Sequence, residues 1–303
     1  MSLVRWAPNH ILSGSDMTRS WLDPTLYPFE PRFMTVDGER LHYLDEGEGD
    51  PILFIHGTPT WSFLWRDFIK ELRGTHRCIA PDHLGFGLSD KPAAANYTPQ
   101  AHAERLALFI ETLDLENFTL VVHDFGGPIG LSYALKRPEA VRSLFIMNTW
   151  LWSNEGNKTI ERANGLLKGP VGNFLYKRLN FSARVLLKAG FADKTKLTKE
   201  LHAHYLKPFD SPAKRSAPHA LAKALTASND WYASLWEQRY ILNRLPMTIA
   251  WGMKDSFFPP AHLERWQEAF PNATVTRFED AGHFLQEEVT DGLIQTLKDS
   301  LNS

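Results

Sequence analysis

Short apolar segments alternate with amphipathic segments along most of this 303-residue chain, and this alternation is the feature that most restricts its fold. The apolar segments are rich in Val, Ile and Phe, and each is followed by turn residues and then by apolar residues at helical spacing. Such a pattern is typical of an α/β fold, with a mostly parallel sheet and helices on both faces. Strands are predicted near residues 40–45, 51–55, 76–80, 118–123, 143–148, 246–251 and 273–278.

Three helices are predicted clearly from their ends. Thr98 and Pro99 form an N-cap followed by proline at the first helical position, where the missing N–H has no cost. A second helix is expected over residues 127–136, and a third begins at Pro260. Strand and helix therefore alternate on both sides of a central interruption.

The interruption lies between about residues 150 and 240, where helical segments follow one another without a convincing strand. The strand pattern then resumes in the segment MTIAWG. We therefore expect a helical cap at residues 150–240, inserted into a core formed by residues 1–149 and 241–303. No internal repeat of fixed period suggests a solenoid instead.

The charge of the chain is nearly balanced, with 33 basic and 35 acidic residues and no long block of one sign. Nucleic acid and membranes are therefore not expected as partners, whereas a small molecule is. The single cysteine, Cys78, excludes an intramolecular disulfide and argues against a thiolate metal site. The first ten residues lack the pattern of an export signal, and no segment approaches the ~20 apolar residues of a membrane span, so a cytoplasmic location is expected.

The segment VVHDFGGP places Asp124 at a sharp turn between a predicted strand and a predicted helix. Reactive groups in such sheets gather at the carboxyl ends of the strands. A nucleophile at this turn needs small neighbours, which Gly126 and Gly127 supply. The match to the usual nucleophile elbow is partial, because Val122 replaces its first glycine. The simplest alternative is that Asp124 only caps the helix.

Two later loops supply an acid and a histidine. Asp255 follows one strand in WGMKDSFFPP, and His283 follows the last strand in FEDAGHF. The order nucleophile, acid, histidine is that of α/β-hydrolases. Glu279 and Asp280 compete for the role of the acid, but they lie close to His283 in sequence. A lone aspartate after a strand also often caps the next helix, which is the alternative for Asp255.

The loop FIHGTPTW follows the second predicted strand and is expected to direct a backbone N–H toward the same site. The N–H groups of Thr58 and Phe125 together would form an oxyanion hole. His56 and His123 are expected to brace the backbone rather than to carry protons.

Aspartate in place of serine at the elbow narrows the chemistry. A carboxylate that attacks an ester carbonyl gives a reactive anhydride, whereas attack on an sp³ carbon gives a stable alkyl ester. The leaving group is then a halide or the oxygen of a strained ring, carried by a small apolar substrate. His283, oriented by Asp255, would take a proton from the water that hydrolyses the ester. No metal, nucleotide or flavin cofactor is expected.

Six sequence segments resemble haloalkane dehalogenases and their neighbours, the epoxide hydrolases, in the α/β-hydrolase superfamily. The resemblance covers both halves of the predicted core and implies an α/β-hydrolase fold with an inserted helical cap. It also implies a triad of Asp124, His283 and Asp255, because relatives whose acid follows the later strand have Asn after the preceding strand, as Asn148 is here. The segments are HGTPTWSFLWRDFIKEL, APDHLGFGLSDKP, VVHDFGG, IMNTWLW, WGMKD and AGHF.

The chain departs from the dehalogenases at the groups that hold the halide. Those enzymes use a Trp directly after the nucleophile, together with an Asn in the HGNP-type loop or a second Trp in the cap. In this chain Phe125 stands at the position of the Trp after the nucleophile, and Thr58 stands at the position of the Asn in the HGNP-type loop. One lost donor costs ~10²–10³ in rate, so dehalogenation would be slow without a substitute. Trp150 and Trp152 are candidates for that role and for substrate binding, although both could simply pack the hinge of the cap.

Epoxide hydrolysis is the main alternative function. Epoxide hydrolases commonly protonate the ring oxygen with two cap tyrosines, and the cap region holds Tyr176, Tyr205, Tyr232 and Tyr240. A ligand-binding or luciferase-like relative is a third possibility on this fold. Further apolar candidates for the cavity wall, each of which could instead belong to the ordinary core, are Phe63, Trp65, Phe174, Leu175, Leu187 and Phe257.

Overall fold

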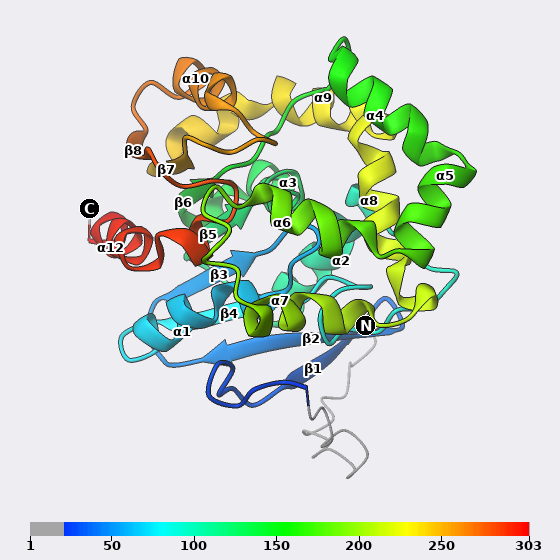
Figure 1. The fold of residues 1–303 in the computed structure, drawn as a ribbon. Helices are drawn as coiled ribbons and strands as arrows, with labels where there is room; N and C mark the ends of the chain where they lie inside the picture. Colours follow the sequence, from blue (N-terminus) through cyan, green and yellow to red (C-terminus); the bar gives the residue numbers. More distant parts are fainter. Residues whose placement is uncertain (1–20, 303) are drawn as a thin grey trace, which may run out of the picture.

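The predicted mostly parallel sheet is confirmed by the computed structural model, which describes residues 21–302 (Figure 1). The segment considered for an export signal, residues 1–10, lies outside the described residues. The sheet order is β1-β2-β4-β3-β5-β6-β7-β8; pairs involving β1 or β2 are antiparallel, and the other pairs are parallel. The strands are β1 (Arg32–Val36), β2 (Glu39–Glu46), β3 (Pro51–Ile55), β4 (Arg77–Pro81), β5 (Phe118–His123), β6 (Val141–Met147), β7 (Met247–Gly252) and β8 (Thr274–Phe278).

The edge strand β1 is absent from the strands predicted by sequence. Only one of its five residues is buried, so it lacks the continuous apolar run by which central parallel strands are recognised. A hairpin turn joins it to β2 through Asp37 and Gly38, whose φ angles are 52° and 79°. Positive φ at two successive residues is what the type I′ two-residue hairpin turn requires, and Asp-Gly is a preferred pair for it.

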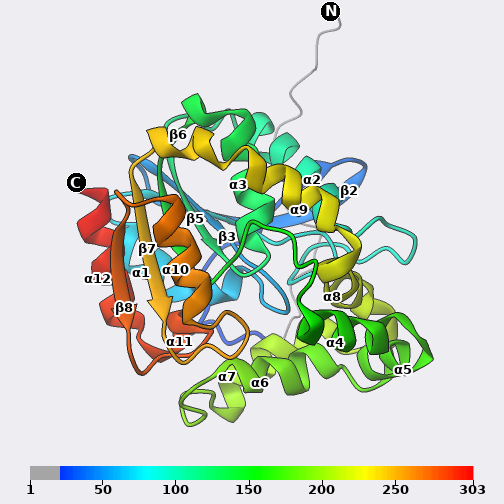
Figure 2. The ribbon, with the colours of Figure 1, turned by 90° about the horizontal axis from the view of Figure 1, so that it is seen from above.

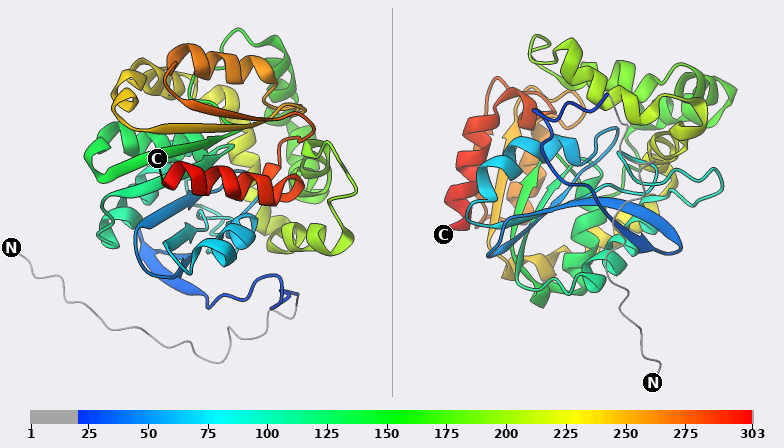
Figure 3. Two further views of the ribbon diagram at one scale, coloured as in Figure 1. Left: turned by 90° about the vertical axis from the view of Figure 1, so that its left-hand side faces the viewer. Right: turned by 90° about the horizontal axis from the view of Figure 1, so that it is seen from below.

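Helices cover both faces of the sheet (Figure 3). The apolar faces of α2, α3 and α10 share one core with the sheet, and those of α1 and α12 share the other. The predicted start of α2 is confirmed, because the Thr98 hydroxyl accepts the N–H of Ala101 at 3.3 Å. The core helices are α1 (Arg66–Leu72), α2 (Pro99–Thr112), α3 (Gly126–Lys136), α10 (Pro260–Ala269), α11 (Leu285–Glu288) and α12 (Thr290–Leu301), with short turns η1 (Ser62–Trp65) and η2 (Pro138–Ala140).

Between β6 and β7 the described chain forms helices and no strand. The helices α4 to α8 lie together at one side of the molecule, whereas α9 and η7 return along α3 (Figure 2). None of the helices in residues 21–302 has the length and apolar character needed to cross a bilayer. The helices of this segment are α4 (Lys158–Lys168), α5 (Pro170–Asn173), η3 (Phe174–Arg178), η4 (Ser182–Leu186), α6 (Leu187–Gly190), α7 (Lys199–Leu206), η5 (Lys207–Phe209), η6 (Pro212–Arg215), α8 (Ser216–Ala227), α9 (Asn229–Glu237) and η7 (Arg239–Arg244).

A buried ion pair links this helical segment to the core. Arg66 of α1 donates two hydrogen bonds to the carboxylate of Glu287 in α11, at 2.6 and 2.7 Å. The hydroxyl of Tyr205 in α7 donates to the same carboxylate at 2.5 Å. Burial opposes the charge on Arg66, but Glu287 outweighs it, and the pKa of the guanidinium is raised. One carboxylate therefore satisfies buried donors from two other helices.

We expect Glu287→Ala to lower the free energy of unfolding by about 3 kcal/mol, because the buried guanidinium loses two short hydrogen bonds and keeps only the half-buried Asp67, at 3.2 Å, as a counter-ion. Chemical denaturation followed by circular dichroism measures this loss. Asp280→Ala is the matched control, since it removes an equally short pair, Lys254–Asp280, that lies exposed at the surface. Equal stability losses in the two variants would contradict the structural role of Glu287.

Candidate active site

Asp124 lies on the turn between β5 and α3 with φ at 53°, a conformation that side-chain-bearing residues adopt rarely. The helix packs tightly beneath this turn. A Cβ on Gly126 would lie 2.2 Å from the carbonyl oxygen of Ile55, and a Cβ on Gly127 would lie 1.9 Å from Oγ1 of Thr149. The alternative that Asp124 merely caps α3 is not supported, because no side chain makes a capping hydrogen bond at the start of that helix.

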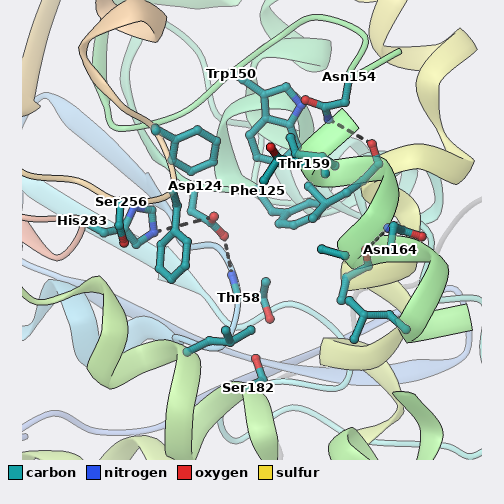
Figure 4. Close-up of a pocket in the computed structure, with 18 of the residues that line it drawn as sticks. Thr58, Asp124, Phe125, Trp150, Asn154, Thr159, Asn164, Ser182, Ser256 and His283 are labelled. Atoms are coloured by element: carbon teal, nitrogen blue, oxygen red, sulfur yellow. Dashed lines mark hydrogen bonds and ion pairs between the residues drawn. The ribbon is translucent and has the colours of Figure 1, made fainter. Parts of the chain in front are cut away.

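The two oxygens of the Asp124 carboxylate have different surroundings (Figure 4). Oδ1 accepts the backbone N–H of Thr58 at 2.7 Å, and Oδ2 lies 3.7 Å from Nε2 of His283. A Cβ on Gly57 would lie 2.1 Å from Oδ1, so only glycine allows this approach of the loop. Burial raises the pKa of Asp124, an effect opposed by His283 and by the N–H groups of Phe125 and Thr58.

His283 and Asp255 form a buried hydrogen-bonded pair behind this carboxylate. Nδ1 of His283 lies 2.7 Å from Oδ2 of Asp255. Burial disfavours the charged imidazole, but Asp255 and Asp124 more than compensate, so the pKa of His283 is raised. Burial also disfavours the charged Asp255 carboxylate, but the interactions with His283 outweigh the effect of burial. The pKa of Asp255 is therefore lowered. The imidazole therefore bridges the two carboxylates, with Nε2 directed at Asp124.

Asn148 holds the acid in place. Its side-chain N–H donates to Oδ2 of Asp255 at 2.7 Å, and its side-chain oxygen accepts the N–H of Gly252 at 2.8 Å. The N–H groups of Phe257 and Phe258 donate to the other carboxylate oxygen, Oδ1, at 2.7 and 3.1 Å. Three donors besides the histidine thus fix the orientation of the carboxylate.

The competing acids lie outside this arrangement. Glu279 and Asp280 are exposed, and Asp280 pairs with Lys254. The expectation that two other histidines brace backbone is confirmed. His56 contacts the carbonyl oxygen of Gly57 at 2.7 Å, and His123 contacts the carbonyl oxygen of His283 at 2.8 Å.

Glu288 is a buried residue of this site that the sequence analysis did not single out. Its carboxylate accepts the N–H of Gly282, beside His283, at 2.9 Å. It also accepts the N–H groups of Ala192 and Asp193, at 2.9 and 2.8 Å. The histidine loop is thus tied to the segment that follows α6. The available signal was an acid five residues after a candidate histidine, which alone does not separate a buried carboxylate from a surface one.

The His283–Asp255 pair lies beside a cavity of about 450 Å³, a volume typical of small-molecule sites. Of the apolar candidates for its wall, only Phe257 lines it. Phe63, Trp65 and Leu187 belong to the buried core, and Phe174 is exposed. The remaining candidate, Leu175, is half-buried and does not line it. The wall is Thr58, Pro59, Asp124, Phe125, Trp150, Asn154, Asn157, Thr159, Ile160, Ala163, Asn164, Leu167, Tyr176, Ser182, Leu186, Ala222, Leu225, Ser256, Phe257, Phe258, Pro259, His262, His283 and Phe284.

The two tryptophans after β6 have different positions. Trp150 lines the cavity and packs edge-on against Phe125, with ring centroids 4.8 Å apart. Its indole N–H has no hydrogen-bond partner in residues 21–302, and Figure 4 shows the nitrogen-bearing edge of the ring on the side away from Asp124. Trp152 is outside the cavity wall and packs against Trp236 and Trp266, as its structural alternative predicts.

The four cap-region tyrosines do not converge on the carboxylate. Tyr176 alone lines the cavity, Tyr205 binds the Arg66–Glu287 pair, and Tyr240 is exposed. Tyr232 is buried with a hydroxyl that has no partner in the described chain, and it does not line the cavity. Burial and the Asp124 charge raise its pKa well above the ordinary value.

We expect Asp124→Asn to lower the pKa of His283. The negative charge of Asp124 stabilises the imidazolium across 3.7 Å, and the amide removes that charge without changing the shape of the side chain. Titration of the His283 ring protons by NMR in the two proteins measures the effect. An unchanged or higher midpoint in the variant would show that Asp255 alone sets the titration.

Comparisons with known proteins agree with this geometry. The pattern of the alpha/beta hydrolase fold matches residues 50–289. The chain is 36% identical to haloalkane dehalogenase 2 of Mycobacterium tuberculosis, over 89% of this chain and 94% of that protein. It is 33% identical to a cis-3-alkyl-4-alkyloxetan-2-one decarboxylase of Shewanella oneidensis, over 90% and 89%. The crystal structure of haloalkane dehalogenase DatA from Agrobacterium tumefaciens matches with a TM-score of 0.81 and 27% identity, over 90% and 96%.

Proposed function

The chain belongs to the α/β-hydrolase-fold family as an enzyme with dehalogenase-like function, and on this premise we propose that Asp124 is its nucleophile. In this proposal Asp124 displaces a halide from an sp³ carbon of a small apolar substrate, and His283 with Asp255 activates the water that hydrolyses the ester. Residues 150–240 act as the cap over a core of residues 1–149 and 241–303. A cytoplasmic location is part of the proposal and agrees with a single, free, buried cysteine, Cys78.

The first step uses the oxygen that faces the histidine. Because the N–H of Thr58 holds Oδ1, Oδ2 is the oxygen available to attack the substrate carbon. A C–O bond forms as the carbon–halogen bond breaks, and the halide leaves with the bonding electrons. Burial prepares this attack, since a carboxylate with little hydration loses little solvent on approaching the carbon.

The second step uses the oxygen that the backbone holds. Formation of the ester removes the Asp124 charge, which favours the neutral His283 needed as a base. Nε2 takes a proton from water, whose oxygen attacks the ester carbonyl carbon, and the N–H groups of Thr58 and Phe125 stabilise the charge that develops on Oδ1. Collapse of this intermediate releases the alcohol and restores the carboxylate.

The observation that carries the proposal is the position of His283 between two carboxylates at the wall of a largely apolar cavity. An imidazole so placed can relay a proton when one carboxylate orients it and the other receives the substrate. The hydrogen bonds of Asp255 fit the first role, and the position of Asp124 in the cavity wall fits the second.

Bromide release from 1-bromobutane, compared with diol formation from styrene oxide, tests the leaving group. We expect wild-type protein to release bromide and Asp124→Asn to release none. Diol formation without bromide release would replace the proposal with epoxide hydrolysis. Absence of either product in the folded protein, together with an unmodified Asp124, would overturn the role of the carboxylate.

We expect Phe125→Trp to raise the rate of bromide release by about 10²-fold. Phe125 lines the cavity beside the nucleophile and offers no side-chain donor, whereas an indole N–H there would stabilise the departing halide. Steady-state bromide release measures the change, with Phe125→Leu as the control that alters volume without adding a donor. An unchanged or lower rate in a folded Phe125→Trp variant would show that halide departure does not limit turnover.

Opening of a four-membered cyclic ester is a second candidate, favoured by the absence of a side-chain donor at Phe125. In an oxetan-2-one the strain of the ring promotes departure of the carboxylate, so less stabilisation by a donor is needed. Attack of Asp124 on the ring sp³ carbon would give an ester and a free carboxylate. Loss of carbon dioxide would then form an alkene and expel Asp124. Alkene formation from a cis-3,4-dialkyl-oxetan-2-one, assayed beside bromide release, separates the two candidates.

A further inference from the structure

The outer surface of α4, α5, η3 and η4 exposes large apolar side chains. Eight such side chains are exposed in the described residues, and five of them lie between residues 166 and 185. None of the five lines the cavity. A concentration of exposed apolar groups in one region marks an interaction surface more often than isolated ones do. They are Leu166 (66% exposed), Val171 (57%), Phe174 (55%), Leu179 (47%) and Val185 (47%).

The same region carries most of the positive charge imbalance of the chain. Residues 158–190 contain seven basic and one acidic residue, so the other residues contain 26 basic and 34 acidic ones. None of the seven cations forms an ion pair with any residue of the described chain. All are exposed except Lys177, which is half-buried. They are Lys158, Arg162, Lys168, Lys177, Arg178, Arg184 and Lys188.

We propose that this surface, residues 158–190, docks on an anionic lipid bilayer. Unpaired cations attract acidic headgroups, and exposed apolar side chains among them insert between those headgroups, which is the pattern of proteins that lie on a membrane without crossing it. An acidic protein would be attracted by the charges equally. A bilayer accounts better for five apolar side chains scattered over several short helices, because a fluid surface needs no complementary shape.

The position of the surface agrees with this occupant. Figure 2 shows α4, α5 and α6 together at one side of the molecule, outside the sheet. The inner side of α4 contributes Ile160, Ala163 and Leu167 to the cavity wall. One layer of helices therefore separates the docking surface from the cavity, while the core helices remain away from the bilayer.

This proposal departs from the expectation that no membrane is a partner, which considered the charge of the whole chain. The net charge of −2 is the sum of a charge of +6 in residues 158–190 and a charge of −8 in the other residues. The charge is also not contiguous in sequence, since the seven cations are separated by apolar and neutral residues. The helices that carry them, from α4 to α6, lie together in the fold (Figure 2).

Co-sedimentation of the full chain with vesicles tests the docking. We expect the protein to pellet with vesicles containing about one-third phosphatidylglycerol, to stay in solution with phosphatidylcholine alone, and to be released by about 0.5 M salt. Lys168→Glu with Arg178→Glu should weaken binding by about tenfold or more, because each cation near an acidic surface contributes about a fivefold factor. Leu166→Ser with Phe174→Ser should weaken it to a similar extent.

Matched substitutions outside the surface serve as controls. Lys136→Glu with Arg244→Glu changes the net charge equally, and Leu108→Ser removes an exposed apolar side chain of α2. These controls should bind as wild type does, and all variants should keep their rate of bromide release without vesicles. Failure of wild type to pellet with acidic vesicles at low salt overturns the proposal and favours an acidic protein. Equal weakening by the control substitutions also overturns it. Neither result bears on the chemistry at Asp124, which is measured without vesicles.

Discussion

His283→Phe is expected to stop the enzyme after its first chemical step and leave the substrate alkyl group attached to Asp124. The attack by Oδ2 does not require the imidazole, whereas hydrolysis of the ester requires a base within reach of water. Steady-state bromide release should fall by about 10⁴-fold or more, as when the histidine of a catalytic triad is removed. Intact-mass analysis after incubation with 1-bromobutane should show one butyl group per chain.

The fold should tolerate this substitution. His283 is buried among the rings of His123, Phe257, Phe258 and Phe284, with centroids within 5.5 Å, so a phenyl ring suits the space. In this variant the carboxylate of Asp255 loses its contact with His283 but keeps three other hydrogen-bond donors. His283→Gln offers a second variant in case the phenyl ring disturbs the loop.

Two further proteins make the trapping experiment specific. Asp124→Asn combined with His283→Phe should acquire no mass, which assigns the adduct to the carboxylate. Incubation of His283→Phe with styrene oxide should give a hydroxyalkyl adduct only if the enzyme opens epoxides. Release of bromide at the wild-type rate by His283→Phe would exclude the histidine as the base, because turnover would then proceed without it.

The fold could be predicted from the sequence where the strands show continuous runs of buried apolar residues. Within residues 21–302 the central strands β3 to β7 form such runs because helices cover both of their faces, and these five strands were located from them. The edge strand β1 has one covered face at most and leaves no such run. Its signal was the pair Asp37–Gly38, which predicts a hairpin turn by conformation rather than by burial.

The candidate site was predictable where backbone geometry and chemistry act on the same residue. Asp124 could be found because the turn demands small neighbours, and Asp255 and His283 because they follow strands of one sheet. Glu288 could not be found, since its role depends on N–H groups of Ala192 and Asp193, nearly a hundred residues away. A contact between distant segments leaves no local pattern.

The cavity wall was the least predictable part, because its residues come from loops after strands and from helices of the inserted segment, whose packing is not encoded by a local period. Phe63 and Phe257 are both aromatic residues in apolar segments, yet only Phe257 reaches the cavity. Trp150 and Trp152 are two positions apart and diverge, one into the cavity wall and the other against α10. In both cases the packing of neighbouring elements, and not the residue type, decides which side chain reaches the cavity.

Asp255→Asn is expected to lower steady-state turnover by about 10⁴-fold while leaving the fold intact. In wild type, Oδ2 of Asp255 accepts from Nδ1 of His283 and from the side-chain N–H of Asn148, both at 2.7 Å. An amide can accept the N–H groups of Phe257 and Phe258 only with its oxygen on their side, and this orientation turns its NH2 group toward His283 and Asn148. The imidazole would then adopt the wrong tautomer, as in triads whose acid becomes an amide. The pKa of His283 should also fall, because a neighbouring negative charge is lost.

The position of Asn148 allows a rescue experiment. A new carboxylate at position 148 should restore turnover to a variant without Asp255, which is not expected if the role of Asp255 is only structural. Asn148 and His283 contact the same oxygen, so a carboxylate one methylene longer at position 148 can reach the space that Asp255→Ala vacates. We expect Asn148→Glu in the Asp255→Ala background to recover at least about tenfold of the lost rate and to raise the pKa of His283 again. Asn148→Gln in the same background is the matched control, because it has the same length without the charge. Equal recovery by both variants would mean that shape rather than charge matters behind the histidine, and would remove Asp255 from the triad.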